Sequence, residues 1–318
     1  MVPNTAGDGP RTITVSPMTL HIGAEISGVD LKRPLSDEQR REIREAWVTW
    51  KVVFFRGQHL DHAQHVAFAR RFGEPTVGHA VFGHEEAFPE IYSVAKVRAG
   101  NTLYQGKPLL TPWSFWHADL TCAINPPVGS ILRGDIVPPY GGDTHWTDLV
   151  AAYRGLSAPM RDIVDRLDAV HAFEVPEGDG ARAEYAESLR NRTMVTEHPL
   201  VRVHPDSGER SLYLSPSFLR RISGLHPRES QKLLELLWEH AVRPEYTVRF
   251  RWQPGDVAFW DNRSTAHLAP LDIFESDFDR QLYRITLVGE VPYGVDGRRS
   301  KAIEGRPILS VAEELAAA

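Results

Sequence analysis

Cysteine is almost absent from this chain of 318 residues, because Cys122 is the single example. One cysteine excludes an internal disulfide framework and any cysteine-rich metal site, and it is typical of a reducing compartment. We expect the Cys122 side chain to behave as a small buried hydrophobe.

Membrane spans and targeting signals are also missing from the sequence. No apolar run approaches the roughly 18 residues of a membrane span. The start MVPNTAGDGPR has neither a cationic segment followed by an apolar one nor an Arg-rich amphipathic pattern. The formal charge is only -6, and the basic residues are scattered, which argues against nucleic acid or an anionic membrane as a partner. We therefore predict a cytoplasmic protein.

The residues that are present, 42% apolar and 25% charged, are typical of a globular protein with one large core. Residues 36–50 predict an amphipathic helix, because Ser36 and Gln39 have the spacing of a capping box. The run at 51–57 is rich in β-branched and aromatic residues and predicts a buried strand. A second helix is expected at 61–73.

Beyond residue 112 the pattern changes to short strand candidates separated by Gly, Pro and Asp, with helical patterns at about 149–172 and 226–240. The strand candidates are FWHADLT, VGSILRGDIV, GDTHWTD, VRVHP, SLYLS, YTVRFRW, GDVAFWDN and RQLYRITLVGE. Many short strands and few helices predict a mainly β fold, a double-sheet roll of antiparallel strands with flanking helices. The turn-rich stretch at about 74–112 is typical of a lid, and the charged stretch at about 174–195 indicates a surface insertion.

The motif His-x-Asp occurs three times and is weak evidence by itself. Its copies are His59–Asp61, His117–Asp119 and His204–Asp206. The first ends where Asp61 is expected to cap a helix, and the third lies in the turn-like HPDSGE, so both are interpreted as structural. The middle copy is expected on a strand, where residues two apart share a face. It is either a metal-ligand pair or a hydrogen-bonded His–Asp pair in the core.

A third ligand is available far downstream, since His267 follows the strand candidate GDVAFWDN. Two histidines and one carboxylate with open positions form the facial triad of mononuclear non-haem Fe(II) oxygenases, whereas catalytic zinc needs its own general base, and none is evident. Arg280 and Arg284 lie four apart on the last strand candidate. Each is suited to hold an oxyanion, and the alternative is a pair of salt-bridged surface arginines.

At these residues the chain resembles the taurine dioxygenase family of Fe(II)- and 2-oxoglutarate-dependent oxygenases. The resemblance runs from about residue 13 to 295 and rests on KVVFFRGQ, WHADLT, YGGDTHWTDLVAAYRGLS, TEHPLVRVHPDSGERSLY, WQPGDVAFWDNRSTAH and RQLYRITLVGEVP. It implies a double-stranded β-helix (jelly-roll) domain at 13–295, between a loose N-terminus at 1–12 and a C-terminal extension at 296–318. It also implies a homo-oligomer, a dimer or tetramer.

The resemblance implies roles for single residues as well. His117, Asp119 and His267 would be the iron ligands, and Thr144 with Arg280 would hold the distal carboxylate of 2-oxoglutarate, with O2 as the other co-substrate. The presence of Asp119 argues against halogenation, because related halogenases lack this carboxylate.

The resemblance implies substrate binding for two further residues: Arg284 matches the position that binds a sulfonate, and His79 matches a histidine that assists it. Trp113 and Phe115 depart from the small polar residues of taurine-specific relatives. They favour an apolar alkyl or aryl portion over a compact ammonium, and the alternative is that they are lid residues packed on the core. The expected reaction hydroxylates the carbon next to a sulfonate or sulfate group and releases sulfite or sulfate and an aldehyde. Three alternatives remain: oxidation of an aryloxy-carboxylate or a secondary-metabolite acid, a zinc hydrolase, and a jelly-roll protein that only binds an anion.

Overall fold

The computed structural model describes residues 11–78, 83–95, 111–112, 114–173 and 193–317. Helix α1 (Asp37–Trp50) begins at Ser36 through the predicted capping box, and its buried side includes Ile43 and Trp47. Helix α2 (His62–Ala69) begins at Asp61 through a second capping box. It ends earlier than the sequence suggested, at Ala69. The local capping signals therefore determined where both helices begin.

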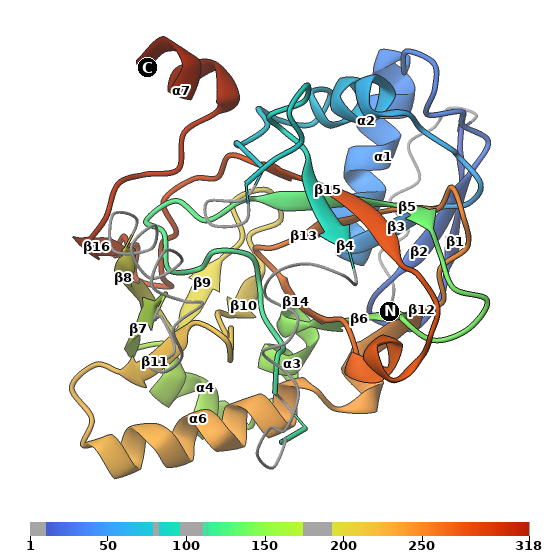
Figure 1. Cartoon of the computed structure of the whole chain (residues 1–318). Coiled ribbons are helices and arrows are strands. Elements are labelled where there is room, and N and C mark those ends of the chain that lie inside the picture. Colours follow the sequence, from blue (N-terminus) through green and yellow to red (C-terminus); the bar gives the residue numbers. More distant parts are fainter. Residues whose placement is uncertain (1–10, 79–82, 96–110, 113, 174–192, 318) are drawn as a thin grey trace.

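The largest sheet is mostly antiparallel and has seven strands in the order β1-β2-β3-β13-β5-β15-β4. The strands are β1 (Thr14–Pro17), β2 (Ala24–Ser27), β3 (Val52–Phe55), β13 (Val257–Asp261), β5 (Gly129–Ile136), β15 (Gln281–Leu287) and β4 (Tyr92–Ala95). Helices α1 and α2 cover one face of this sheet (Figure 1). They pack there in a core with Val53 and Phe259.

The other face of the large sheet points into the interior of the roll. There it packs against the three-stranded sheet β12-β6-β14, in a core that includes Phe54, Trp146, Trp260 and Leu282. These three strands are β12 (Thr247–Phe250), β6 (Thr144–Asp148) and β14 (Thr265–Leu268). Alternate side chains of one strand serve opposite faces, so residues adjacent in sequence enter different cores. The predicted β roll is confirmed.

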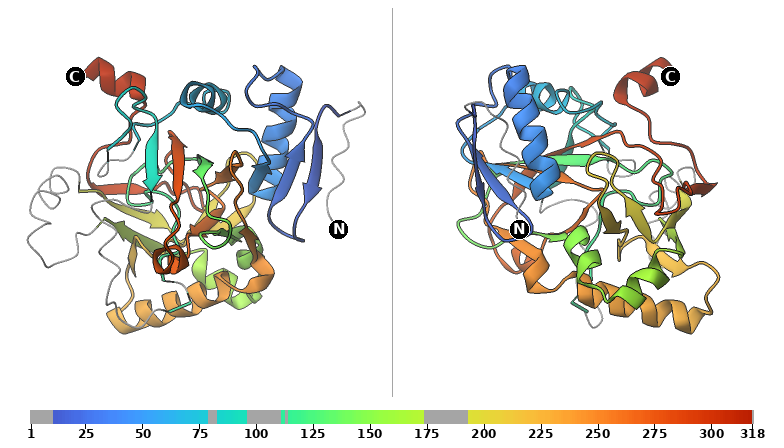
Figure 2. Two further views of the ribbon diagram at one scale, coloured as in Figure 1. Left: turned by 45° about the vertical axis from the view of Figure 1, so that its right-hand side comes forward. Right: turned by 180° about the vertical axis from the view of Figure 1, so that it is seen from behind.

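Two smaller sheets and the remaining helices complete the molecule. The sheet β11-β7-β8-β16 and the pair β10-β9 are built from β7 (Asp168–Ala172), β8 (Val195–Pro199), β9 (Val201–Val203), β10 (Arg210–Leu212), β11 (Leu219–Ile222) and β16 (Lys301–Glu304). The helices are α3 (Leu149–Gly155), α4 (Ala158–Val164), α6 (Pro227–Ala241) and α7 (Val311–Ala317), with 3-10 turns η3 (Pro244–Tyr246) and η4 (Leu271–Glu275). Strand β1 and helix α7 lie far apart (Figure 2). No described helix is long and apolar enough to cross a membrane.

Three details differ from the sequence-based expectations. The stretch FWHADLT is not a regular strand, because within it only His117 forms an isolated bridge, and turns lie on both sides at 114–115 and 119–122. The pattern at 149–172 ends in strand β7 rather than in helix. The stretch at 74–112 contains β4, which pairs with β15. Much of this stretch, and residues 174–192 of the predicted insertion, lie outside the described residues.

Candidate active site

Two of the predicted ligands, His117 and His267, meet at an isolated antiparallel bridge. The amide of His117 donates to the carbonyl of His267 at 2.9 Å, and the reverse bond is 2.7 Å long. On β14 the residue next to His267, Ala266, packs in the core under α3 and α6. Because side chains alternate along a strand, the imidazole of His267 points the other way, into the roll. Residues far apart in the sequence thus share one site.

Asp119 lies in the turn after this bridge and completes the group. Its Oδ1 atom is 3.9 Å from Nε2 of His117 and 4.0 Å from Nε2 of His267. Ligand atoms of the three residues all lie within 4.8 Å of one another. The sequence pattern predicts that His117 and Asp119 lie together on one face of a strand. Their side chains do lie together, but the bridge at His117 and the turn at Asp119 bring this about.

The two histidine rings are oriented by their surroundings. His117 Nδ1 lies 2.9 Å from the carbonyl oxygen of Phe115, and donation to this acceptor leaves the Nε2 lone pair facing Asp119. The ring of His267 packs against Trp260, with centroids 4.8 Å apart. Burial lowers the pKa of both histidines, so both rings are neutral at physiological pH, which is the form that binds a metal.

Asp119 is a buried carboxylate with strong partners. Ser130 donates to Oδ2 at 2.6 Å and Arg284 donates to Oδ1 at 2.7 Å. Burial by itself would raise the pKa of Asp119, but the charge of Arg284 and the hydrogen bond from Ser130 lower it well below its usual range. The carboxylate is therefore ionised. Two neutral imidazoles and one carboxylate fit the donor set that mononuclear Fe(II) takes in a facial triad.

Thr144 and Arg280 lie in the same interior, near the start of β6. The Thr144 hydroxyl accepts a hydrogen bond of 2.9 Å from the indole of Trp252, which leaves its own proton to donate. Arg280 is buried, and its Nε donates to the carbonyl of Gly142 at 3.1 Å. Gly142, with φ +65°, admits this side chain because a Cβ atom there would lie 3.0 Å from Arg280 Cδ.

Arg284 points into the roll beside the candidate ligands. It shares a face of β15 with Leu282, which belongs to the interior core. Its guanidinium lies 5.2 Å from the centre of the Tyr92 ring. Its Nε atom is buried and has no hydrogen-bond partner among the described residues. The positively charged guanidinium of Arg284 therefore faces the three candidate ligands, and its Nε–H is available to donate a hydrogen bond.

Of the remaining predicted substrate residues, Phe115 lies in the described part of the chain. Phe115 has a left-handed backbone, with φ +67°, and its carbonyl orients His117. Its ring stays a predicted substrate contact. His79 and Trp113 lie outside the described residues. His84, the other histidine near this position, is exposed and bonds to the Glu85 carbonyl.

Sequence reasoning missed the polar residues that support the site. Ser130, Asn262 and Trp252 are buried and bond to candidate site residues or to their partners. The signal that was available is a serine or asparagine inside an otherwise apolar strand region, as in VGSILRGD and VAFWDNRS.

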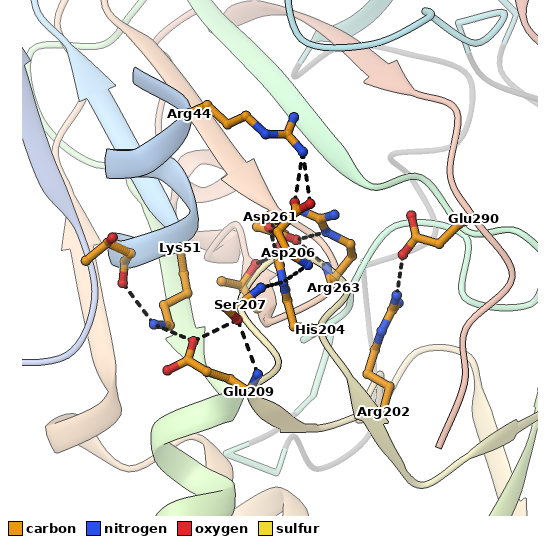
Figure 3. A network of polar contacts seen from close by, with 12 residues as sticks. Arg44, Lys51, Arg202, His204, Asp206, Ser207, Glu209, Asp261, Arg263 and Glu290 are labelled. Carbon is orange, nitrogen blue, oxygen red and sulfur yellow. Dashed lines mark hydrogen bonds and ion pairs between the residues drawn. The ribbon is translucent and has the colours of Figure 1, made fainter. Parts of the chain in front are cut away.

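The histidines outside the triad also have clear environments. His65 on α2 is fully buried. His204, of the third His-x-Asp copy, contacts Asp261 at 2.9 Å. Figure 3 shows that Asp261 also binds Arg263, which reaches Asp206. This copy is structural, as expected.

Comparison with known proteins gives one consistent result. The profile of the family described as "Taurine catabolism dioxygenase TauD, TfdA family" matches residues 14–286. The chain is 42% identical to an alpha-ketoglutarate-dependent sulfate ester dioxygenase of Pseudomonas putida, over 91% of this chain and 94% of the relative. It is 38% identical to an alkylsulfatase of Acinetobacter baylyi, over 89% and 87%.

A solved structure agrees with these relatives. The crystal structure of a taurine dioxygenase from Burkholderia xenovorans is 58% identical, covers 93% of this chain and 96% of its own, and superposes with a TM-score of 0.82. The fold is therefore the jelly roll of these dioxygenases. The chain belongs to the TauD/TfdA family of 2-oxoglutarate-dependent dioxygenases.

Proposed function

We propose that this enzyme hydroxylates the carbon that bears a sulfate or sulfonate group in an alkyl substrate, with 2-oxoglutarate and O2 as co-substrates. In this proposal His117, Asp119 and His267 hold Fe(II). Bound Fe(II), with 2-oxoglutarate and O2, supplies the oxidation of the C–H bond, and 2-oxoglutarate is converted to succinate and CO2. The protein supplies position and charge.

The co-substrate is assigned to the region at the start of β6, where Thr144 and Arg280 lie. The Arg280 guanidinium and the Thr144 hydroxyl would both donate to the distal carboxylate of 2-oxoglutarate. Support comes from the burial of both residues and from the partners that fix them, Gly142 and Trp252. A charge-assisted bond of this kind is strong when it is shielded from water.

Arg284 is assigned to the anionic end of the substrate. The observation that carries this proposal is its buried Nε, which has no partner among the described residues, together with its 2.7 Å contact with Asp119. A sulfate or sulfonate oxygen bound by Arg284 would place the adjacent carbon beside the triad. Such placement matters because an error of about 1 Å can cost roughly 10²-fold in rate.

The products follow from the chemistry of the hydroxylated carbon. A sulfate ester RCH2OSO3⁻ gains one oxygen atom to give RCH(OH)OSO3⁻, which collapses to the aldehyde RCHO and hydrogen sulfate. A sulfonate would give the aldehyde and sulfite by the same route. The relatives named for sulfate esters and alkyl sulfates favour the ester.

The test is succinate formation by protein reconstituted with Fe(II) and supplied with 2-oxoglutarate in air. The substrates compared are medium-chain alkyl sulfates, alkyl sulfonates, taurine and aryloxy-carboxylates. We expect an alkyl sulfate to yield succinate and sulfate in equal amounts. Stimulation by an aryloxy-carboxylate alone, without sulfate or sulfite release, would contradict the proposed substrate class.

A further inference from the structure

A chain of buried side chains leads from the large sheet to the candidate ligand Asp119. Trp260 on β13 donates through its indole to Asn262 Oδ1 at 2.9 Å, and Asn262 Nδ2 lies 2.8 Å from Ser130 Oγ. Ser130 in turn bonds to Asp119 Oδ2 at 2.6 Å. All four residues are buried.

The direction of every bond in this chain is determined. An indole N–H only donates, so the atom of Asn262 that faces Trp260 is its carbonyl oxygen. The amide of Asp119 also reaches this oxygen, at 3.3 Å. The NH2 group of Asn262 must then donate to Ser130, and the single hydroxyl proton of Ser130 is left to donate to Asp119 Oδ2.

The consequence is that the two carboxylate oxygens of Asp119 have different environments. Oδ2 is held by Ser130, whereas Oδ1 faces Nε2 of His117 and of His267 and also accepts from Arg284 at 2.7 Å. Polar groups that orient a ligand in this way are worth about 10- to 100-fold in metal affinity. We propose that Ser130 and Asn262 are positioning residues that aim Oδ1 of Asp119 at the metal.

The turn that carries Asn262 is itself held in place. Asp261 bonds to Arg263, two residues further on, through both carboxylate oxygens and to His204. Its backbone carbonyl accepts from the Thr265 hydroxyl at 2.7 Å. These contacts fix both ends of the segment between β13 and β14, so Asn262 has little freedom to leave Ser130.

The sequence offers a matched control in the same segment. Ser264 is buried like Ser130, and its hydroxyl has no hydrogen-bond partner among the described residues. The variants Ser130→Ala and Ser264→Ala therefore remove the same atom from two buried positions. They differ in whether that atom binds the carboxylate of Asp119.

The experiment measures Mn(II) binding by each variant, followed as free Mn(II) by electron paramagnetic resonance, without substrate or turnover. We expect Ser130→Ala to raise the Kd for Mn(II) at least about tenfold, and Ser264→Ala to stay within about twofold of the parent protein. Asn262→Asp, which replaces the donating NH2 with an acceptor, should raise the Kd as Ser130→Ala does. The thermal midpoint of the metal-free protein, measured alongside, should fall for Ser130→Ala, which removes a hydrogen-bond partner from Oδ2 of Asp119 and from Nδ2 of Asn262, and should stay near that of the parent for Ser264→Ala.

This inference rests on the metal triad of the proposed function. The variant Asp119→Ala distinguishes a failure of the triad from a failure of the positioning role of Ser130 and Asn262. If Asp119→Ala binds Mn(II) as tightly as the parent, the triad is wrong and the positioning role is lost with it. If Asp119→Ala loses binding but Ser130→Ala and Asn262→Asp bind like Ser264→Ala, the triad stands and the positioning role is refuted.

Discussion

Gly142 controls where the Arg280 side chain lies. The backbone of Gly142 has φ +65°, and a Cβ atom there would lie 3.0 Å from Cδ and 3.1 Å from Nε of Arg280. Comfortable contacts between carbon atoms need about 3.5 to 4.0 Å, so Gly142→Ala should displace the guanidinium by about half an ångström. The bond from Arg280 Nε to the Gly142 carbonyl, 3.1 Å long, would be strained or broken.

Two effects of this substitution can be separated. An alanine in a left-handed backbone conformation lowers the free energy of unfolding by about 1 to 2 kcal/mol. Displacement of Arg280 weakens the binding of 2-oxoglutarate. We expect the KM for this co-substrate to rise about tenfold, because an error of about 1 Å in position can cost roughly 10²-fold in rate. Gly57 is the control, since it has φ +60° and a Cβ atom added there would meet no atom within 4 Å.

The assay compares Gly142→Ala and Gly57→Ala for the co-substrate KM and for the thermal midpoint. Both variants should lose stability, Gly142→Ala more than Gly57→Ala because it also strains the bond from Arg280, and only Gly142→Ala should raise the KM. An equal KM in the two variants would refute the idea that Arg280 is held where it is to bind the co-substrate.

Two further predictions concern charged groups in the interior. Burial, followed by the charge of Arg133, lowers the pKa of His65 to about 3 in the folded protein. In the unfolded chain a histidine has a pKa of about 6.5. As the pH falls, the unfolded state therefore takes up a proton before the folded state does. Stability should therefore fall as pH drops from about 6.5 to 3, and His65 accounts for about 2 kcal/mol of that loss between pH 7 and pH 5. Urea unfolding at the two pH values should show a smaller loss for His65→Leu, and an unchanged loss would contradict this assignment. Separately, Arg284→Ala should raise the KM for the sulfated substrate about 10- to 100-fold, as expected for lost hydrogen bonds from a charged donor, whereas Arg280→Ala should chiefly raise the KM for the co-substrate. Steady-state kinetics should be measured with the substrate and the co-substrate varied in turn. An equal rise of both KM values in both variants would contradict this division of roles.

The sequence by itself determined the features that depend on neighbours in the chain. The capping boxes at Ser36 and Asp61 set the starts of α1 and α2, because a cap needs only residues three positions away. The β-branched and aromatic run at 52–55 became β3 because it suits a strand with both faces buried. The set of candidate ligands was also available, since residue type limits which side chains suit iron.

The tertiary structure decided whatever depends on partners far away in the chain. The expected strand around His117 is only a bridge to His267, because the next amide, that of Ala118, donates to the side chain of Ser215 between β10 and β11 instead of to a strand. The burial of His65 did not follow from its helical spacing, because it depends on the packing of α2 against β15 of the large sheet. The hydrogen bonds from Trp260 to Asp119 join residues that meet in space but come from distant parts of the sequence. Periodicity along a sequence indicates which face a side chain occupies, and only the folded chain shows which groups meet there.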